Sequence, residues 1–170
     1  ESGKALHVSV GTGGISGEDM TTTLAGISIV EFLADEAAAS GIAPVITTSD
    51  STTLLLAQDT LRRPHVRQGD LSGYQSLSAQ QLALNSTQYA AATMDYLAHD
   101  QVSANVMSGA FGVEVGLIEH EADQQSLSQM TGAGDPRALA IMLASHENVL
   151  IGEEWQIWRV DFSRAFRLSK

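Results

Sequence analysis

The sequence predicts an α/β fold, a three-layer sandwich with a Rossmann-like, mostly parallel sheet of five or six strands and helices on both faces. Three observations predict it. Short apolar runs alternate with longer segments whose apolar residues recur at helical spacing. Many of the short runs end at glycine or at a group of hydroxyl and acidic residues. These residue types are expected in the turn between a strand and the helix that follows it. Such alternation implies parallel strands that are joined by right-handed crossovers.

Length and charge limit the protein classes that need to be considered. A chain of 170 residues predicts one domain over residues 1–170. The net charge of −11 argues against non-specific nucleic-acid binding, which needs a basic face, so we expect no nucleic-acid partner. The absence of cysteine excludes disulfides and thiolate metal sites. Because residue 1 is Glu and not Met, we expect the chain to be a piece of a longer protein.

The N-terminal half contains two units of strand, turn and helix. The first predicted strand, Ala5–Val10, leads into the glycine-rich stretch Gly11–Gly17, and a helix over Met20–Ser40 follows and ends at Gly41. The second unit has a strand at Pro44–Ile46, a polar turn, and a helix that is expected to stop at Pro64.

The C-terminal half continues the alternation after a loose region, Pro64–Gln80, that is rich in glycine and serine. The predicted strands are Gln81–Asn85, Ser103–Ser108, Gln125–Thr131 and Asn148–Ile151, and the predicted helices are Ser86–His99, Val113–Glu121, one that begins at Asp135-Pro136, and Glu153–Phe166. A single long helix over Ser78–His99 is the alternative to the strand Gln81–Asn85 followed by the helix Ser86–His99. Asp135-Pro136 is the sharpest local signal, because Asp caps a helix and Pro fits its first position.

Small, polar and acidic residues follow the predicted strands, and parallel strands end at a common edge where ligands bind in such folds. The candidate ligand-binding residues are Thr12, Gly13, Gly14, Ser49, Asp50, Ser108, Gly109, Thr131, Gly132, Glu153 and Glu154. They suit a polar or cationic ligand, or a divalent metal held by Asp50 with a glutamate. Helix capping by Ser, Thr and Asp explains the same residues without a ligand, so no metal site and no cofactor is assigned.

Recognised catalytic motifs are absent, so the sequence leaves open whether the protein is an enzyme. There is no G-x-S-x-G and no H-E-x-x-H. The glycine-rich stretch departs from the dinucleotide fingerprint G-x-G-x-x-G, because Ser16 stands at the third glycine position. Its simplest interpretation is a tight turn between strand and helix, and an anion-binding loop is the alternative.

The C-terminus differs in composition from the rest of the chain. Both tryptophans and four of the nine basic residues lie within the last 16 positions. One interpretation is a segment at a membrane interface, with aromatic rings at the headgroups and cations on anionic lipid. The other is a closing helix whose aromatic side chains pack on the sheet.

Three segments of the chain are distinctive together: TLAGISIVEFLADEAAASGIAPVITTSDSTTLLLAQDTLR, ANVMSGAFGVEVGLIEHEADQQSLSQMTGAG and NVLIGEEWQ. They resemble an uncharacterised family of bacterial and archaeal membrane-anchored proteins. The resemblance covers roughly residues 6–161 and implies an α/β domain flanked by membrane segments. It transfers no activity and no ligand, and the chain departs from the family pattern in Pro64–Gln80.

Our leading hypothesis is a non-enzymatic domain of a membrane-associated protein that serves small-ligand sensing or self-assembly. We expect a homo-oligomer, membrane proximity through the C-terminal segment, and a location on the cytoplasmic side. The alternative hypothesis is a nucleotide- or metal-dependent enzyme or binder that uses the Gly11–Gly17 loop and Asp50.

Overall fold

The predicted α/β fold with a parallel sheet is confirmed by a computed structural model, which describes residues 5–41, 43–100, 102–145 and 149. The strands are β1 (Ala5–Gly11), β2 (Val45–Thr48), β3 (Ala79–Gln81), β4 (Val102–Ala110) and β5 (Ser128–Ala133), and their order in the sheet is β3-β2-β1-β4-β5. Every neighbouring pair of these strands is parallel. The helices are α1 (Met20–Ser40), α2 (Ser51–Gln68), α3 (Ser86–His99), α4 (Val115–Gln124) and α5 (Pro136–Ser145), with a short 3-10 turn η1 (Ser76–Ser78) before β3.

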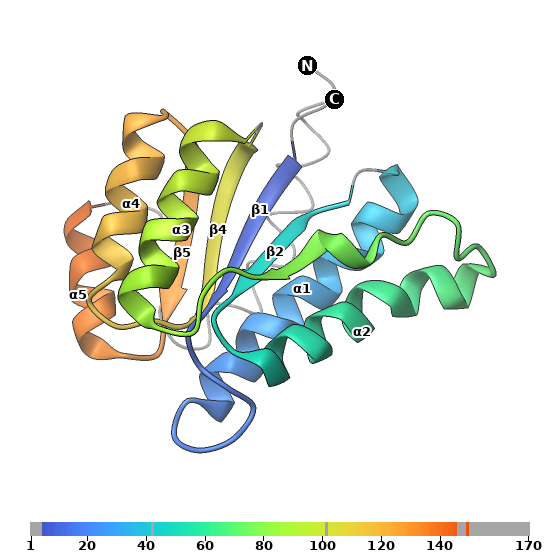
Figure 1. The fold of residues 1–170 in the computed structure, drawn as a ribbon, viewed down its shortest axis with the longest axis horizontal. Helices are drawn as coiled ribbons and strands as arrows, with labels where there is room; N and C mark the ends of the chain where they lie inside the picture. The colour runs from blue at the N-terminus through green and yellow to red at the C-terminus, as the bar shows by residue number, and fades with distance from the viewer. Residues whose placement is uncertain (1–4, 42, 101, 146–148, 150–170) are drawn as a thin grey trace.

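Helices cover both faces of the sheet, with α1 and α2 on one face and α3, α4 and α5 on the other (Figure 1). Strand β1 shows how one strand serves both faces, because successive side chains point to opposite sides. Leu6, Val8 and Val10 belong to the apolar core beneath α1 and α2. His7 and Ser9, on the other face, contact polar groups from neighbouring strands and α3. The β1 side chains of both faces are therefore buried, as is usual in a parallel sheet.

The strand order reverses between β1 and β4, since the chain runs outward from β1 through β2 to β3 and then returns to place β4 on the other side of β1. This reversal defines the switch point, at whose carboxyl edge folds of this kind bind ligands. At the β5 side, Val149 forms a parallel bridge with Thr131. That bridge lies where the predicted strand Asn148–Ile151 would extend the sheet, but the rest of this strand and the helix Glu153–Phe166 lie outside the described residues.

Helix α2 does not stop at Pro64, which corrects the predicted boundary. Pro64 lies inside the helix and its side chain is buried, and the helix ends only at Gly69, whose N–H donates to the carbonyl groups of His65 and Val66. A proline in a helix interior removes one hydrogen bond and costs about 3 kcal/mol. Burial of the ring in the domain and the glycine cap offset this cost.

The third strand is displaced from its predicted position, Gln81–Asn85, to residues 79–81. Its register is imposed by β2, because Ala79 pairs with Ile46 and Gln81 with Thr48. Asn85 is not in a strand but caps α3, and its side chain accepts hydrogen bonds from Thr87 and Gln88. The alternative of one long helix over Ser78–His99 is therefore wrong.

Within the described residues, no helix combines the length and the apolar character that crossing a membrane requires.

Candidate functional site

The glycine-rich loop after β1 lies directly against the end of β4. The N–H of Thr12 donates to the carbonyl oxygen of Ala110 at 2.8 Å, which continues the pairing of the two strands across the switch point. Gly11 has a φ of +86°, and a Cβ at this position would lie 2.2 Å from the same oxygen. A glycine is required here on both counts, because other residues rarely adopt this φ and no side chain fits.

Asp50 lies beside this loop, at the start of α2. Its Oδ1 accepts hydrogen bonds from the backbone N–H groups of Thr52 at 2.9 Å and Thr53 at 2.8 Å, and also from the Thr52 hydroxyl group. Its Oδ2 faces Gly14, where an added Cβ would lie 3.2 Å away. The hydroxyl of Thr53 donates to the carbonyl of Gly13 at 2.9 Å and thereby ties the loop to the helix.

The charge of Asp50 is stabilised by its role as a helix cap. Partial burial acts to raise the pKa of this carboxyl, but the hydrogen bonds from Thr52 and Thr53 outweigh burial and hold its pKa below the ordinary value. Asp50 is therefore ionised at neutral pH. The arrangement places a negative charge at the carboxyl edge, next to the glycine-rich loop.

Ser49 is buried behind Asp50 and contributes mainly backbone contacts. Its N–H donates to the carbonyl of Gly11 at 3.0 Å. Its own carbonyl accepts a hydrogen bond from Gln81 Nε2 at 2.9 Å, and Gln81 Oε1 accepts one from the Ser51 hydroxyl at 3.0 Å. Gln81 thus belongs to this edge, although the sequence had placed it at the beginning of a strand, where its side chain would lie far from the site.

Ser108 and Gly109 lie at the end of β4 but serve packing. A Cβ on Gly26 of α1 would lie 2.2 Å from the carbonyl oxygen of Ser108, and a Cβ on Gly109 would lie 2.0 Å from that of Val10. The Ser108 side chain is fully buried, and its hydroxyl makes no hydrogen bond within the described part of the chain. Neither residue offers a polar group to solvent.

Thr131 and Gly132 lie one strand further from the switch point, opposite Met107 and Ser108 respectively. Both are buried. Glu153 and Glu154 lie outside the described residues. Of the predicted site, the structure therefore brings together Thr12, Gly13, Gly14, Ser49 and Asp50, with Ser108 and Gly109 in the strand beside them and Thr131 and Gly132 apart.

The turns that lead into the helices carry carboxylates at this edge. Asp19, Asp50, Glu114 and Asp135 immediately precede α1, α2, α4 and α5, and Asn85 precedes α3. Negative charge there offsets the partial positive charge of each helix N-terminus. Arg137 is the one basic residue near these turns in the described part of the chain, and it pairs with Asp135 at 2.9 Å. The edge therefore disfavours a phosphate.

No three His, Asp or Glu side chains in the described ranges are grouped closely enough to hold a metal ion.

A buried polar network on the α3 side of the sheet was not predicted as a unit. His7 Nδ1 contacts Asn105 Oδ1 at 2.7 Å, and its Nε2 contacts the Thr47 hydroxyl at 2.9 Å. The Tyr89 hydroxyl contacts the hydroxyls of Thr47 at 2.9 Å and Ser9 at 2.5 Å. All five side chains are buried. Only His7 carries a signal in the sequence, because it alternates with the apolar residues Leu6 and Val8 in a predicted strand, a pattern that favours a hydrogen-bonded side chain on the other face.

The comparisons with known proteins identify a family. A family profile described as a domain of unknown function, DUF6754, matches residues 2–164. The chain belongs to the DUF6754 family. No curated protein and no solved structure matches it significantly. The match covers most of the chain and confirms the expected membership of an uncharacterised family, and it assigns neither an activity nor a membrane anchor.

Proposed function

We propose that this DUF6754 domain binds a small polar or cationic ligand at the carboxyl edge of its sheet and acts as a sensing module, not as an enzyme. The observation that carries the proposal is the position of Asp50. Its ionised carboxylate lies beside the switch point, and its Oδ2 lies next to Gly14, where a Cβ would be 3.2 Å away. A cation or a hydrogen-bond donor on a ligand would pair with this oxygen.

The loop geometry supports such a ligand over a nucleotide. A phosphate-binding loop needs free backbone N–H groups, but the N–H of Thr12 donates to Ala110, that of Ser49 to Gly11, and that of Ile15 to the Thr52 hydroxyl at 3.5 Å. Carboxylates surround the same loop. The alternative, a nucleotide- or metal-dependent enzyme using the Gly11–Gly17 loop and Asp50, would have to place any phosphate next to these carboxylates.

Thermal unfolding in the presence of amines, amino acids, divalent cations and nucleotides tests the proposal. A ligand at 100 times its Kd stabilises a protein by about 2.7 kcal/mol, and we expect such a shift with a cationic compound such as spermidine or arginine. Asp50→Asn should abolish it, because asparagine keeps the capping oxygen but removes the charge.

Asp70→Asn is the matched control. Asp70 also accepts hydrogen bonds from the N–H and hydroxyl groups two residues later, those of Ser72, but it lies in the loop after the other end of α2. This variant should keep the ligand response. Equal losses in both variants, or no response to any cationic compound, would reject the proposed site, and a saturable response to nucleotides with turnover would favour the alternative.

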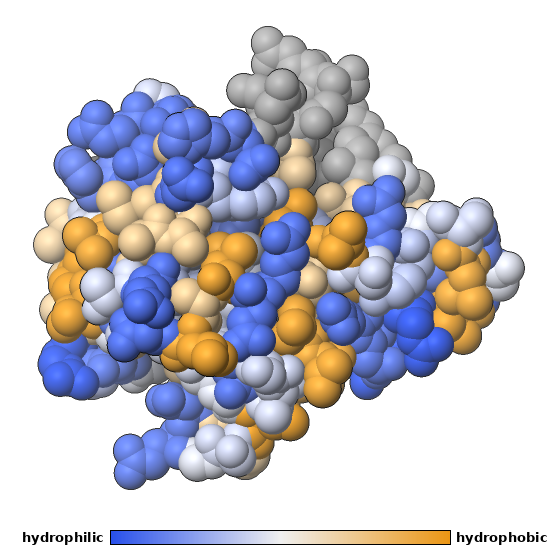
Figure 2. Space-filling model, in the orientation of Figure 1, coloured by the Kyte–Doolittle hydropathy of each residue, from blue (hydrophilic) through white to orange (hydrophobic). Residues whose placement is uncertain are grey.

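Self-assembly is a second proposed role, and the exposed leucines beside the edge strand β3 favour it. Leu77 and Leu84 flank β3 and are 79% and 80% exposed. Apolar residues are scattered among hydrophilic ones over the face seen in Figure 2.

We expect a homo-oligomer by light scattering during size-exclusion chromatography. We expect the double variant Leu77→Gln with Leu84→Gln to shift the measured mass toward that of a monomer. Leu143→Gln, at an exposed position of α5, is the control that should leave the mass unchanged. A monomer at all concentrations would rule this role out.

Membrane association, on the cytoplasmic side, completes the proposal and rests on the aromatic and basic composition of the last 16 residues. Sedimentation of the full chain with vesicles that contain anionic lipid should exceed sedimentation with neutral vesicles. Equal recovery with both would contradict a lipid-facing role for this segment.

A further inference from the structure

Strand β3 ends the sheet, and no further strand pairs with its outer side in the described part of the chain. The opposite end differs, because Thr131 of β5 pairs there with Val149. Proteins usually protect such an open edge with charged side chains, proline or a bulge. The pairing of β3 with β2 has no bulge. Residues 71–94, which we call the uncharged segment, include β3 and contain no Asp, Glu, Lys, Arg or Pro, although 17% of the chain is charged.

The backbone groups of Gln81 point toward this open edge. The N–H of Leu82 donates to the carbonyl of Thr48 at 3.2 Å and therefore points toward β2. Successive residues of a strand direct their backbone groups to opposite neighbours, so the N–H and C=O of Gln81 point away from β2. The N–H of Ala79 points the same way, but it already donates to the carbonyl of Ser76. Within β3, Gln81 therefore offers both a donor and an acceptor to a new strand.

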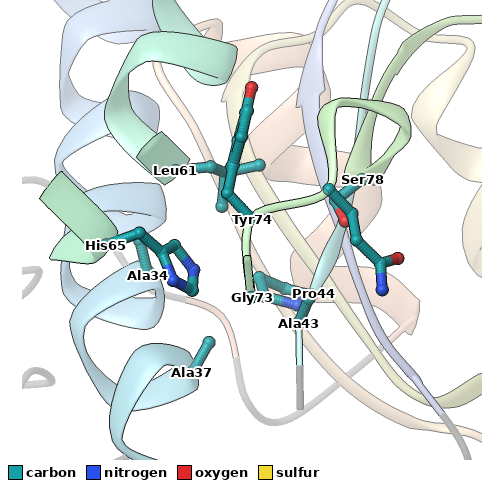
Figure 3. Close-up of a pocket in the computed structure, with 10 residues that line it drawn as sticks. Ala34, Ala37, Ala43, Pro44, Leu61, His65, Gly73, Tyr74 and Ser78 are labelled. Atoms are coloured by element: carbon teal, nitrogen blue, oxygen red, sulfur yellow. The ribbon is translucent and has the colours of Figure 1, made fainter. Parts of the chain in front are cut away.

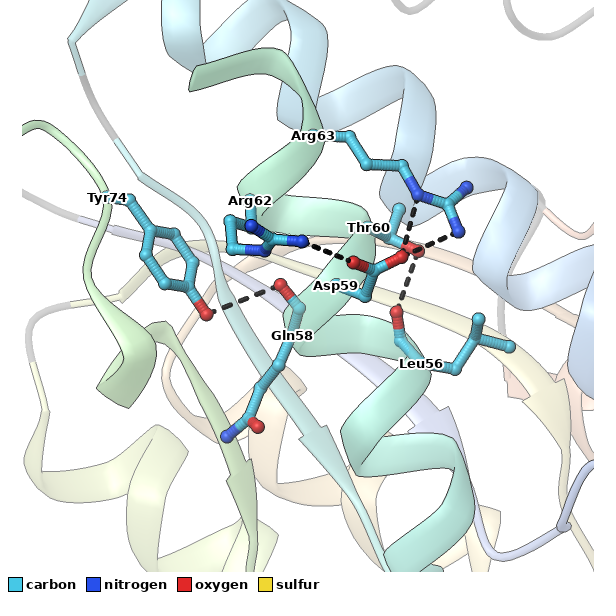
Figure 4. Close-up of polar contacts among 7 residues, drawn as sticks. All are labelled: Leu56, Gln58, Asp59, Thr60, Arg62, Arg63 and Tyr74. Carbon is cyan, nitrogen blue, oxygen red and sulfur yellow. Dashed lines mark hydrogen bonds and ion pairs between the residues drawn. The ribbon is translucent and has the colours of Figure 1, made fainter. Parts of the chain in front are cut away.

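The chain that leads into β3 is fixed against α2, so the open edge is formed before any partner binds. The Tyr74 ring lies 6.2 Å from that of His65, and the Tyr74 hydroxyl donates to the carbonyl of Gln58 at 3.3 Å (Figure 4). Leu61 of α2 and Ser78, the residue before β3, lie around the same small hollow as Tyr74 (Figure 3). A strand that pairs with β3 thus meets a backbone that is already ordered, which lowers the entropic cost of association.

The chemistry around this edge suits a second copy of the same chain. Molecules that each carry a net charge of −11 repel one another, so they meet most favourably through a surface without charges. Leu77 and Leu84, on either side of β3, are 79% and 80% exposed and supply apolar area. Exposed polar side chains of the uncharged segment, such as Gln75 and Ser76, carry amide and hydroxyl groups. These groups both donate and accept hydrogen bonds, so they are complementary to their own kind.

We infer that β3 pairs antiparallel with β3 of a second copy and joins the two sheets into one continuous sheet. This inference rests on the proposed self-assembly and specifies its contact. A two-fold axis beside Gln81 makes this residue its own partner, so each Gln81 N–H donates to the Gln81 carbonyl of the other copy. Because β3 has only three residues, Leu77 and Leu84 add the apolar contacts that such a short pairing lacks. The outer side of β5 already pairs with Val149, so the assembly closes as a dimer.

Two variants at one position test the backbone pairing in the full chain. Gln81→Pro removes the outward N–H and no hydrogen bond to β2, and edge strands accept proline at such positions. By sedimentation equilibrium, the Kd of the dimer should rise roughly tenfold or more, because two symmetric hydrogen bonds are lost. Gln81→Ala loses the same side-chain hydrogen bonds to Ser49 and Ser51 but keeps the N–H. It should dimerise like the wild type, and circular dichroism verifies that both variants are folded.

A cross-linking measurement does not depend on whether Gln81→Pro folds. The chain has no cysteine, and the Cα atoms of a hydrogen-bonded antiparallel pair lie about 5.5 Å apart, within reach of a disulfide. Gln81→Cys should therefore form a disulfide with its own copy under mild oxidation. Ser128→Cys, at an exposed position of β5, is the control that should not.

The outcomes separate this contact from self-assembly in general. A dimer that persists in folded Gln81→Pro, or a wild-type dimer in which Gln81→Cys forms no cross-link, would overturn the β3 contact and leave self-assembly through another surface standing. A wild-type protein that stays monomeric at all concentrations would overturn both.

Discussion

At the scale of single residues, the most constrained group is His7 in the centre of β1. Its ring is fully buried, has hydrogen-bonding contacts at both nitrogens, and lies 5.3 Å from the Tyr96 ring. Burial lowers the pKa of His7 to about 4, and the hydrogen bond to Asn105 opposes this only in part. The folded protein therefore keeps the ring neutral at neutral pH.

We predict that His7 makes the protein less stable as the pH falls from about 6.5 to about 4. The unfolded chain binds a proton at His7 in this range and the folded chain does not, so stability rises with pH. The stability is fully present above the unfolded pKa of 6.5, and about 3 kcal/mol is lost by pH 4. Urea unfolding at pH 7.5 and pH 4.5 measures the loss.

The variant His7→Gln should be less stable at pH 7.5 but should lose less stability on acidification than the wild type. His99→Gln, at a position whose side chain is 75% exposed, should retain the wild-type dependence. If the wild type and His7→Gln change in parallel between the two pH values, the assignment to His7 is wrong.

At the scale of elements, α1 packs tightly against β4 at Gly26. Gly26 occupies a mid-helix position, where glycine costs about 1 kcal/mol relative to alanine. The contact explains why it is there, because a methyl group would lie 2.2 Å from the backbone oxygen of Ser108. Helix α1 can therefore approach β4 this closely at residue 26 only because glycine has no side chain.

We predict that Gly26→Ala destabilises the protein by about 1–3 kcal/mol, despite the better helix propensity of alanine, because backbone atoms must move apart. Ser28→Ala, on the exposed side of the same helix, should stay within about 0.5 kcal/mol of the wild type. Chemical denaturation of both variants provides the measurement. A neutral or stabilising Gly26→Ala would show that α1 can shift without cost.

At the scale of the whole molecule, negative charge is poorly compensated. The arginines of the described residues all lie in ion pairs, Arg62 and Arg63 with Asp59, Arg67 with Asp35 and Arg137 with Asp135. These pairs are largely exposed and each contributes little. The chain still carries a net charge of −11, and such self-repulsion disfavours the compact state.

We predict that raising NaCl from 10 to 150 mM stabilises the protein by about 1 kcal/mol, which corresponds to roughly 2–4 °C in Tm. Salt shortens the screening length from about 30 to 8 Å and weakens repulsion among the unpaired carboxylates more than it weakens the few ion pairs. KCl at the same ionic strength should act equally, which distinguishes screening from binding of one ion. A fall in Tm would mean that the ion pairs dominate.

Local signals in the sequence predicted the elements well, because caps and turns act within a few residues. Gly41 ends α1 with a φ of +76°, Asp50 caps α2, and Asp135 accepts the N–H of Arg137 at the start of α5. The same local reasoning explains which of the candidate residues lie close together, and it does not test whether they bind a ligand. The group of Thr12, Gly13, Gly14, Ser49 and Asp50 follows from the rule that adjacent parallel strands end together, whereas Ser108 was misread because its burial under α1 depends on Gly26.

The sequence by itself determined the alternation of strands and helices, the parallel sheet and the acidic carboxyl edge, since periodicity, caps and charge are local properties. Only the tertiary structure decided the strand order, the extension of α2 past Pro64 and the position of β3. It also assembled His7, Thr47, Tyr89 and Asn105 into one network on the α3 side of the sheet. These features depend on contacts between residues that are far apart in the chain, where each partner alone looks like an ordinary core or loop residue.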